Sequence, residues 1–114
     1  MAFAADEELR RKSMGAVEEA LPQVKAVEGR VCSGDQFISS QEAKDRIIGD
    51  FAGDCAEMEG AAIAQVCYVN KLPFVVLRAI SDKADGSAQM SFEEFEKQAA
   101  RNSATLVQYM LEHW

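Results

Sequence analysis

The run Phe74-Val75-Val76-Leu77-Arg78-Ala79-Ile80 restricts the fold of this chain more than any other feature of its sequence. Every position but one is apolar, and Pro73 precedes the run at a place where a strand tolerates proline. Such runs are typical of strands that are buried on both faces of a parallel sheet. We therefore expect a strand at residues 74–80, with neighbouring strands on both sides and helices above and below.

The rest of the chain alternates between helical and extended patterns. Apolar residues recur at helical spacing in several segments, and two of these begin with a Ser-x-x-Glu capping box, at Ser39 to Glu42 and at Ser91 to Glu94. Shorter segments that run into glycine-containing turns indicate strands. The expected helices are residues 6–21, 41–50, 60–70 and 91–110, and the expected strands are residues 24–32, 55–58 and 74–80.

Strands that alternate with helices predict an α/β fold, a three-layer sandwich in which helices cover both faces of a parallel sheet. A length of 114 residues allows one domain, residues 1–114. A sheet of only three strands leaves its outer strands exposed. We therefore expect this domain to be part of a larger fold.

Charge and composition exclude several kinds of partner. Lys and Arg number 12 against 19 Asp and Glu, a net charge of −7, and no basic cluster is present to bind nucleic acid. No apolar stretch approaches the roughly 20 residues that span a membrane, and the acidic residues 6–8 do not fit a secretion signal. The three cysteines, Cys32, Cys55 and Cys67, suit reduced thiols. We expect a cytoplasmic protein that binds neither nucleic acid nor membrane.

Polar residues stand at the carboxyl ends of all three expected strands, in residues 33–38, 57–60 and 78–82. Ligands of open parallel sheets bind at these strand ends. We therefore expect the three segments to converge on one crevice.

The second of these segments carries two carboxylates, Glu57 and Glu59, which would point to the same side of an extended chain with Met58 opposite. Buried carboxylates need hydrogen-bond donors, and sugar hydroxyls are suitable donors. Alternatively, both glutamates only lead into a helix, where carboxylates favour the positive end. The pattern leaves both interpretations open.

The third segment places Asp82 directly after the apolar strand, next to Ser81 and four residues after Arg78. Desolvation would raise the pKa of such an acid and Arg78 would lower it, and the sequence does not decide between them. The alternative is an aspartate that caps a helix or closes a turn.

Other residues offer less chemistry. His113 is the only histidine and is next to the last residue, so a Ser-His-Asp or Cys-His nucleophile is not expected. No residues have metal-ligand spacing, and no glycine-rich phosphate loop is present. Phe92 and Phe95 are expected in the core, although Phe92 begins a helix near the Asp82 loop.

Together the three segments resemble a known family. Ser33-Gly34-Asp35-x-Phe37-Ile38, Glu57-Met58-Glu59-Gly60-Ala61-Ala62-Ile63-Ala64 and Arg78-Ala79-Ile80-Ser81-Asp82 are similar to the C-terminal half of the 5'-methylthioadenosine/S-adenosylhomocysteine nucleosidases. The resemblance covers essentially the whole chain. It implies the nucleoside phosphorylase-like fold and hydrolysis of the bond between adenine and a 5'-thio-substituted ribose, a step of methionine salvage, with no metal or cofactor. Aminofutalosine is a further substrate within the family.

The resemblance also implies a role for each site residue. Asp82 would be the general acid that protonates adenine N7, because bond cleavage leaves negative charge on the departing base. Glu59 would bind the ribose hydroxyls. The other implied contacts are Phe37 and Ile38 at the adenine, Met58 against the sugar with Glu57 nearby, Arg78 near the ribose and water, Ser81 beside the acid, and Phe92 along the pocket for the 5'-thio group.

The family's water-activating glutamate comes from an N-terminal half that this sequence lacks. We therefore expect the chain alone to have little or no hydrolase activity. The resemblance implies a homodimer, and a separate chain that carries the other half would restore the missing acid. Two alternatives remain: a nucleoside phosphorylase of the same fold, which would use phosphate in place of water, and a truncated module without catalysis.

Overall fold

The computed structural model describes residues 2–36, 38–80 and 92–114. Its elements follow in the order α1 (Glu7–Ala20), β1 (Val31–Ser33), α2 (Gln41–Phe51), β2 (Cys55–Glu57), α3 (Gly60–Val69) and α4 (Phe92–Glu112). They fall into two compact units. The first unit comprises residues up to Asp6 together with Glu28–Val76, and the second comprises Glu7–Val27 together with Leu77–Trp114.

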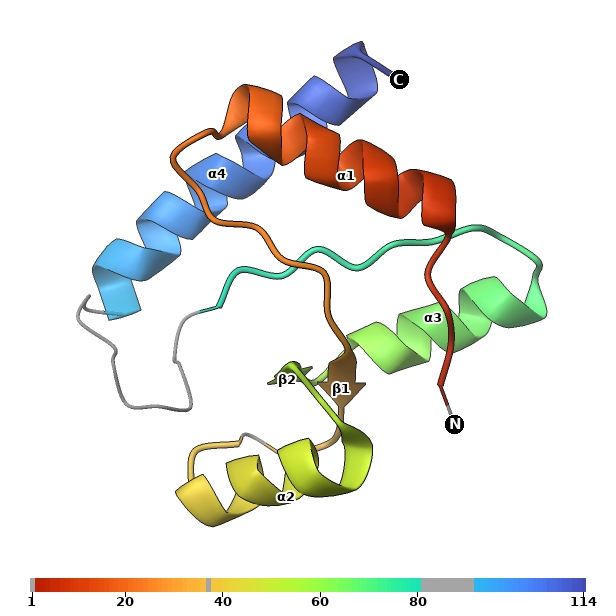
Figure 1. The fold of residues 1–114 in the computed structure, drawn as a ribbon, viewed down its shortest axis with the longest axis vertical. Coiled ribbons are helices and arrows are strands. Elements are labelled where there is room, and N and C mark those ends of the chain that lie inside the picture. The colour runs from red at the N-terminus through yellow and green to blue at the C-terminus, as the bar shows by residue number, and fades with distance from the viewer. Residues whose placement is uncertain (1, 37, 81–91) are drawn as a thin grey trace. The chain divides into compact units, whose positions relative to one another are not determined.

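The first unit is built on a parallel pair of strands, β1 and β2 (Figure 1). Val31 lies opposite Cys55 and Ser33 lies opposite Glu57, so the carboxyl ends of the two strands meet at one edge. A short bend joins β2 to α3, which packs against β1. These connections bring the polar residues at the strand ends to the start of α3.

Hydrogen bonds around Arg30 tie the start of β1 to the residues that precede β2. The Arg30 amide donates to Asp54 Oδ2 at 2.7 Å, and the Asp54 amide donates back to the Arg30 carbonyl at 2.8 Å. The Arg30 guanidinium also donates to the Phe51 carbonyl at the end of α2, at 3.0 Å. These bonds fix the register of the short strand pair.

All four predicted helices are confirmed, and each end lies within two residues of the expected one. The residue that caps α2 was predicted wrongly, because the Ser39 to Glu42 spacing pointed to Ser39. Ser40 is the N-cap instead, and its hydroxyl accepts the Ala43 amide at 3.1 Å. A hydroxyl at this position, three residues before the amide, reaches one of the free donors of the first turn.

The predicted strands are confirmed only in part. Of residues 24–32 only the last two join β1, and residues 55–58 give β2 without Met58. The strand predicted at residues 74–80 is wrong for the described structure, in which these residues belong to no sheet. An apolar composition is compatible with a strand, but a segment is part of a sheet only when its backbone forms a ladder of hydrogen bonds with a neighbouring strand. Phe74 makes one such backbone bond, accepting from the Asp6 amide at 2.8 Å.

The second unit is held together by α1 and α4. Ala16, Leu21 and Leu106 are buried where the two segments meet, and partly buried neighbours surround them: Val17, Ala20, Val24, Tyr109 and Met110. One turn of α1 before Ala16, the Lys12 ammonium lies 4.2 Å from the centre of the Trp114 ring and pairs with Glu8. Among the described helices, none is both long and apolar enough to cross a membrane.

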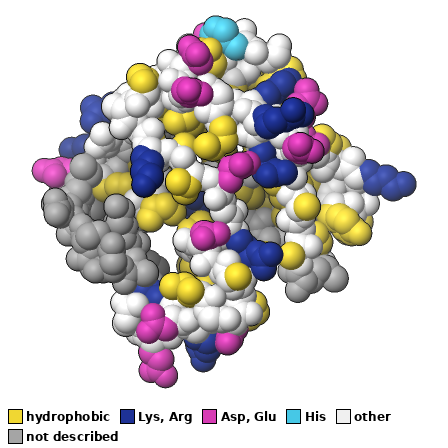
Figure 2. All heavy atoms as spheres, viewed as in Figure 1, with side chains coloured by type: hydrophobic (Ala, Val, Ile, Leu, Met, Phe, Trp, Pro, Cys, Tyr) yellow, Lys and Arg dark blue, Asp and Glu magenta, His cyan; other side chains and the backbone are white. Residues whose placement is uncertain are grey.

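Large apolar side chains also lie on the surface, and Figure 2 shows such side chains on one face of the molecule. On α3, the side chains of Ile63, Val66 and Val69 are 60%, 60% and 69% exposed. On α4 and beyond its end, Leu111 and Trp114 are 72% and 65% exposed. Exposed apolar surface of this extent is typical of a face that another polypeptide covers.

Candidate functional site

Glu57, at the carboxyl end of β2, is buried with 9% of its surface exposed. Its carboxylate accepts the amide of Glu59 at 2.9 Å and the amide of Gly60 at 2.9 and 2.8 Å to its two oxygens. It also accepts the hydroxyl of Ser33 from the neighbouring strand. Glu57 therefore caps α3, and its negative charge lies at the positive end of that helix.

Glu59 occupies the N-cap position of α3 but its side chain does not cap the helix. Both Glu59 and Met58 are exposed. The expectation that Glu57 and Glu59 share one side of an extended segment is wrong, because the strand ends at Glu57 and a bend follows. Glu57 therefore caps the helix, whereas Glu59 is exposed to solvent and follows the exposed Met58 in the chain.

The segment that follows β1 begins beside the same strand end. The Gly34 amide donates to the Glu57 carbonyl at 3.1 Å, which continues the β1–β2 pairing by one bond. Asp35 is exposed and Ile38 is half-buried. Phe37, the other residue expected at an adenine, lies outside the described residues.

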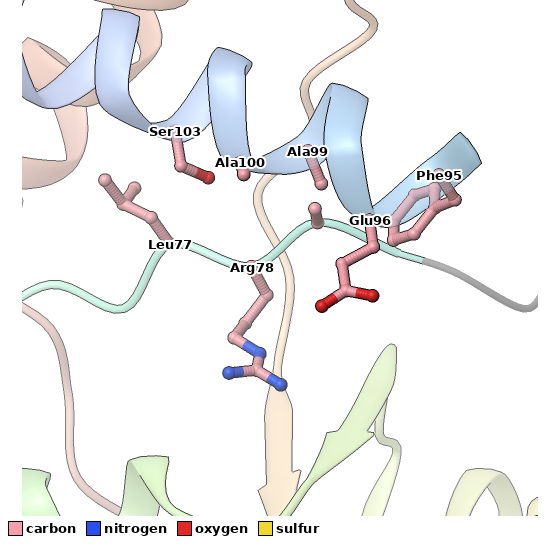
Figure 3. Close-up of a pocket in the computed structure, with 8 residues that line it drawn as sticks. Leu77, Arg78, Phe95, Glu96, Ala99, Ala100 and Ser103 are labelled. Carbon is pink, nitrogen blue, oxygen red and sulfur yellow. The ribbon is translucent and has the colours of Figure 1, made fainter. Parts of the chain in front are cut away.

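Arg78 belongs to the second unit, where it lines an open pocket of about 350 Å³ between residues 77–79 and α4 (Figure 3). The charged ends of Arg78 and Glu96 extend to the same side of this pocket, and Phe95 lines it beside them. Phe95, which was expected in the core, is partly buried there. Ser81, Asp82 and the side chain of Phe92 lie outside the described part of the chain.

Sequence reasoning missed the capping role of Ser33. Its hydroxyl accepts the Ala61 amide at 2.8 Å in addition to donating to Glu57. Ser33 directly follows one expected strand and Glu57 is the last residue but one of the next, and their pairing follows only from the register of β1 and β2. Within the described residues no group of three His, Cys, Asp or Glu side chains is placed to hold a metal ion.

Parallel strands whose carboxyl ends carry polar groups at a helix start are a site architecture of α/β enzymes. A family model described as the phosphorylase superfamily matches residues 1–112, and the chain belongs to that superfamily. Among curated proteins it is similar to a 5'-methylthioadenosine/S-adenosylhomocysteine nucleosidase of Haemophilus influenzae strain PittGG, with 47% identity over 112 residues. This match covers 97% of the chain and 48% of the relative, so the chain spans about half the length of that relative.

Solved structures confirm the predicted fold. The chain is similar to the Campylobacter jejuni 5'-methylthioadenosine/S-adenosyl homocysteine nucleosidase, with 37% identity and a TM-score of 0.89. It is also similar to the corresponding Neisseria meningitidis nucleosidase in complex with methylthio-immucillin-A, with 41% identity and a TM-score of 0.80. Each comparison covers 98% of this chain and 48% of the solved chain. The α/β fold is therefore the nucleoside phosphorylase-like one that the three motifs predicted.

Proposed function

We propose that this chain supplies the adenine- and ribose-binding part of an N-glycosyl hydrolase that cleaves 5'-methylthioadenosine and S-adenosylhomocysteine. The reaction releases adenine and a 5'-thioribose. One observation carries the proposal. In this chain, a member of the phosphorylase superfamily, Met58 and Glu59 are exposed at the carboxyl ends of β1 and β2. The segment that leads to Ile38 begins at the same strand ends. The nucleosidases to which the chain is similar support this substrate class.

In this proposal the base and the sugar are bound by different segments. Ile38 and Phe37 contact the adenine, Met58 lies against the sugar, and the Glu59 carboxylate accepts hydrogen bonds from the ribose hydroxyls. A carboxylate fixed near the sugar also favours the positive charge that develops there as the bond to adenine breaks.

The second group of residues acts on the leaving base and the water. Asp82 donates a proton to adenine N7, and Ser81 lies beside this acid. Arg78 lies near the ribose and the water, and Phe92 lines the pocket for the 5'-thio group. Protonation by a positioned acid contributes typically on the order of 10² to 10⁴ in rate.

Turnover needs more than these residues. Because the chain spans about half the length of its relatives, we propose that the group that activates water is supplied by a second polypeptide segment, in the same or a separate chain. Assembly as a homodimer, a location in the cytoplasm and a role in methionine salvage complete the proposal. The number and spacing of Cys32, Cys55 and Cys67 suit reduced thiols and support a reducing compartment.

Titration of the isotope-labelled chain with adenine and with 5'-methylthioadenosine, followed by NMR, tests the binding part of the proposal. We expect both ligands to shift the Ile38 resonances and only the nucleoside to shift those of Glu59. Uridine is the control, because it has a ribose but no adenine, and it should leave Ile38 unshifted. Shifts caused equally by uridine, or absent with both adenine ligands, would contradict the proposed function.

A further inference from the structure

Both oxygens of the buried Glu57 carboxylate are engaged by donors of the protein itself. These donors include the amides of Glu59 and Gly60 and the hydroxyl of Ser33. A ribose hydroxyl would have to displace one of these donors and leave a buried group without its partner. Glu57 is therefore unsuited to bind the sugar directly, although it stands two residues from Glu59.

Ser33 and Glu57 together satisfy successive amides at the start of α3. Glu57 accepts those of Glu59 and Gly60, and Ser33 accepts that of Ala61. An N-cap side chain normally performs this task, but Glu59 at the N-cap position does not. Because residues from the two strand ends cap the helix instead, the Glu59 carboxylate is not needed as a cap and can bind a ligand.

We infer that Glu57 is a positioning residue, which with Ser33 fixes the bend at Met58 and Glu59 and thereby the direction of the Glu59 carboxylate. This inference rests on the proposed function, in which Glu59 binds the ribose hydroxyls. It assigns the two glutamates different tasks: Glu57 orients the ribose-binding segment, and Glu59 contacts the sugar.

Gly60 is part of the same arrangement. A Cβ atom at this position would lie 2.8 Å from Glu57 Oε1 and 3.2 Å from its carboxyl carbon. Any side chain at residue 60 would therefore displace the carboxylate from the amides that it accepts. The substitution Gly60→Ala moves the Glu57 carboxylate without removing it.

Glu57→Gln gives a second, nearly isosteric disturbance. The glutamine side chain has one acceptor oxygen where glutamate has two. Its NH₂ group would face the Gly60 amide in either orientation, because this amide donates to both carboxylate oxygens. The Gly60 amide then loses one of its two acceptor oxygens, and the Glu59 amide loses its acceptor if the NH₂ group takes the place of Oε2. Ser33→Ala removes the acceptor of the Ala61 amide, and Ser33→Thr keeps it.

The first measurement is amide hydrogen exchange of the chain, read by NMR at Glu59, Gly60 and Ala61. Glu57→Gln should speed exchange of the Gly60 amide about tenfold, and Ser33→Ala should do the same for the Ala61 amide. A tenfold change is the effect of losing one hydrogen bond of about 1.4 kcal/mol. Ser33→Thr should restore protection. Ser40→Ala is the matched control, because it removes a capping hydroxyl from α2 and should leave α3 unchanged. Unchanged exchange in Glu57→Gln and Ser33→Ala would overturn the inference.

The second measurement is the ratio of the affinities for 5'-methylthioadenosine and adenine, which isolates the contribution of the ribose. Glu59→Ala should lower this ratio, because it removes the sugar contact. The ratio should also fall about tenfold, with adenine affinity unchanged, in the three variants that disturb the orientation of Glu59: Glu57→Gln, Ser33→Ala and Gly60→Ala. Loss of the ribose preference in Glu59→Ala but not in Glu57→Gln would overturn the inference and leave the proposed function standing. A preference that survives Glu59→Ala would contradict the proposed function itself.

Discussion

Glu57 and Glu59 are chemically identical and two residues apart, yet their surroundings give them different properties. Glu57 is buried and surrounded by amide and hydroxyl donors, whereas Glu59 is exposed at the helix start. The donors compensate for the desolvation of Glu57 that burial would otherwise make costly. At the scale of single residues, the site depends on which carboxylate caps α3 and which is left exposed to solvent.

Close approach of backbone and side chain sets a second constraint, at Gly53 just before β2. A Cβ atom there would lie 2.6 Å from Cys32 Sγ and 3.0 Å from Ile47 Cγ2. We expect Gly53→Ala to lower the free energy of unfolding by about 1 to 3 kcal/mol, the usual cost of overpacking. Urea unfolding followed by circular dichroism measures it.

Gly49, in the interior of α2, provides the control, because a Cβ atom added there would meet nothing within 4 Å apart from the adjoining backbone of its own helix and its chain neighbours. Gly49→Ala should stabilise the chain by about 0.5 to 1 kcal/mol through helix propensity. Equal effects of the two substitutions would contradict the packing described around Gly53.

The helices were predictable from the sequence because their signals are local. Periodic apolar residues and the polar residues at their starts lie within one segment, so the helices at residues 6–21 and 60–70 were recognised almost to their ends. Strands depend on a neighbour that can be distant in sequence. The run at residues 74–80 therefore has the composition of a strand without being in a sheet of the described structure.

The same distinction applies to the candidate site. The three motifs were sufficient to predict the superfamily, because residue types and their order carry that information. The position of Glu57 at the start of a helix was one of the two interpretations that the sequence left open. Its bond to Ser33 was not predictable, because this bond depends on the register of two strands. A contact between residues of two different elements can be predicted only when the pairing of those elements is known.

The α2 cap offers a direct comparison of two adjacent serines. Ser40→Ala should lower the free energy of unfolding by about 1 kcal/mol, since it removes the acceptor of the Ala43 amide. Ser39→Ala, one residue earlier, should change it by less than about 0.5 kcal/mol. Thermal unfolding followed by circular dichroism compares them, and a larger effect at Ser39 would show that the capping box predicted from the spacing is the real cap.

Packing of α1 against α4 depends on Leu106, which is 8% exposed in the small core with Ala16 and Leu21. Leu106→Ala should lower the free energy of unfolding by roughly 2 to 5 kcal/mol. Leu111→Ala, on the same helix but 72% exposed, should have an effect below about 0.5 kcal/mol. Fluorescence of Trp114, the only tryptophan, during urea unfolding reports on this unit, and comparable losses in both variants would contradict the assigned core.

At the scale of the whole molecule, the described residues bury few apolar side chains and expose many. The buried ones are Ala16, Leu21, Ala64 and Leu106. Relatives about twice as long have a second half available to cover faces such as that of α3. We therefore expect a polypeptide that corresponds to the first half of the Haemophilus influenzae relative to bind the chain and raise its melting temperature, because a ligand of the folded state stabilises that state.

The release of adenine from 5'-methylthioadenosine by this chain, alone and mixed with the first half of the Haemophilus influenzae relative, tests the central claim most directly. We expect no release above background by the chain alone, release by the mixture without added phosphate, and a decrease on the order of 10² to 10⁴ when the chain carries Asp82→Asn. Release that requires phosphate would indicate a phosphorylase. Release by the chain alone that Asp82→Asn abolishes, or an associated mixture that releases no adenine, would contradict the proposed division of the active site between two polypeptide segments.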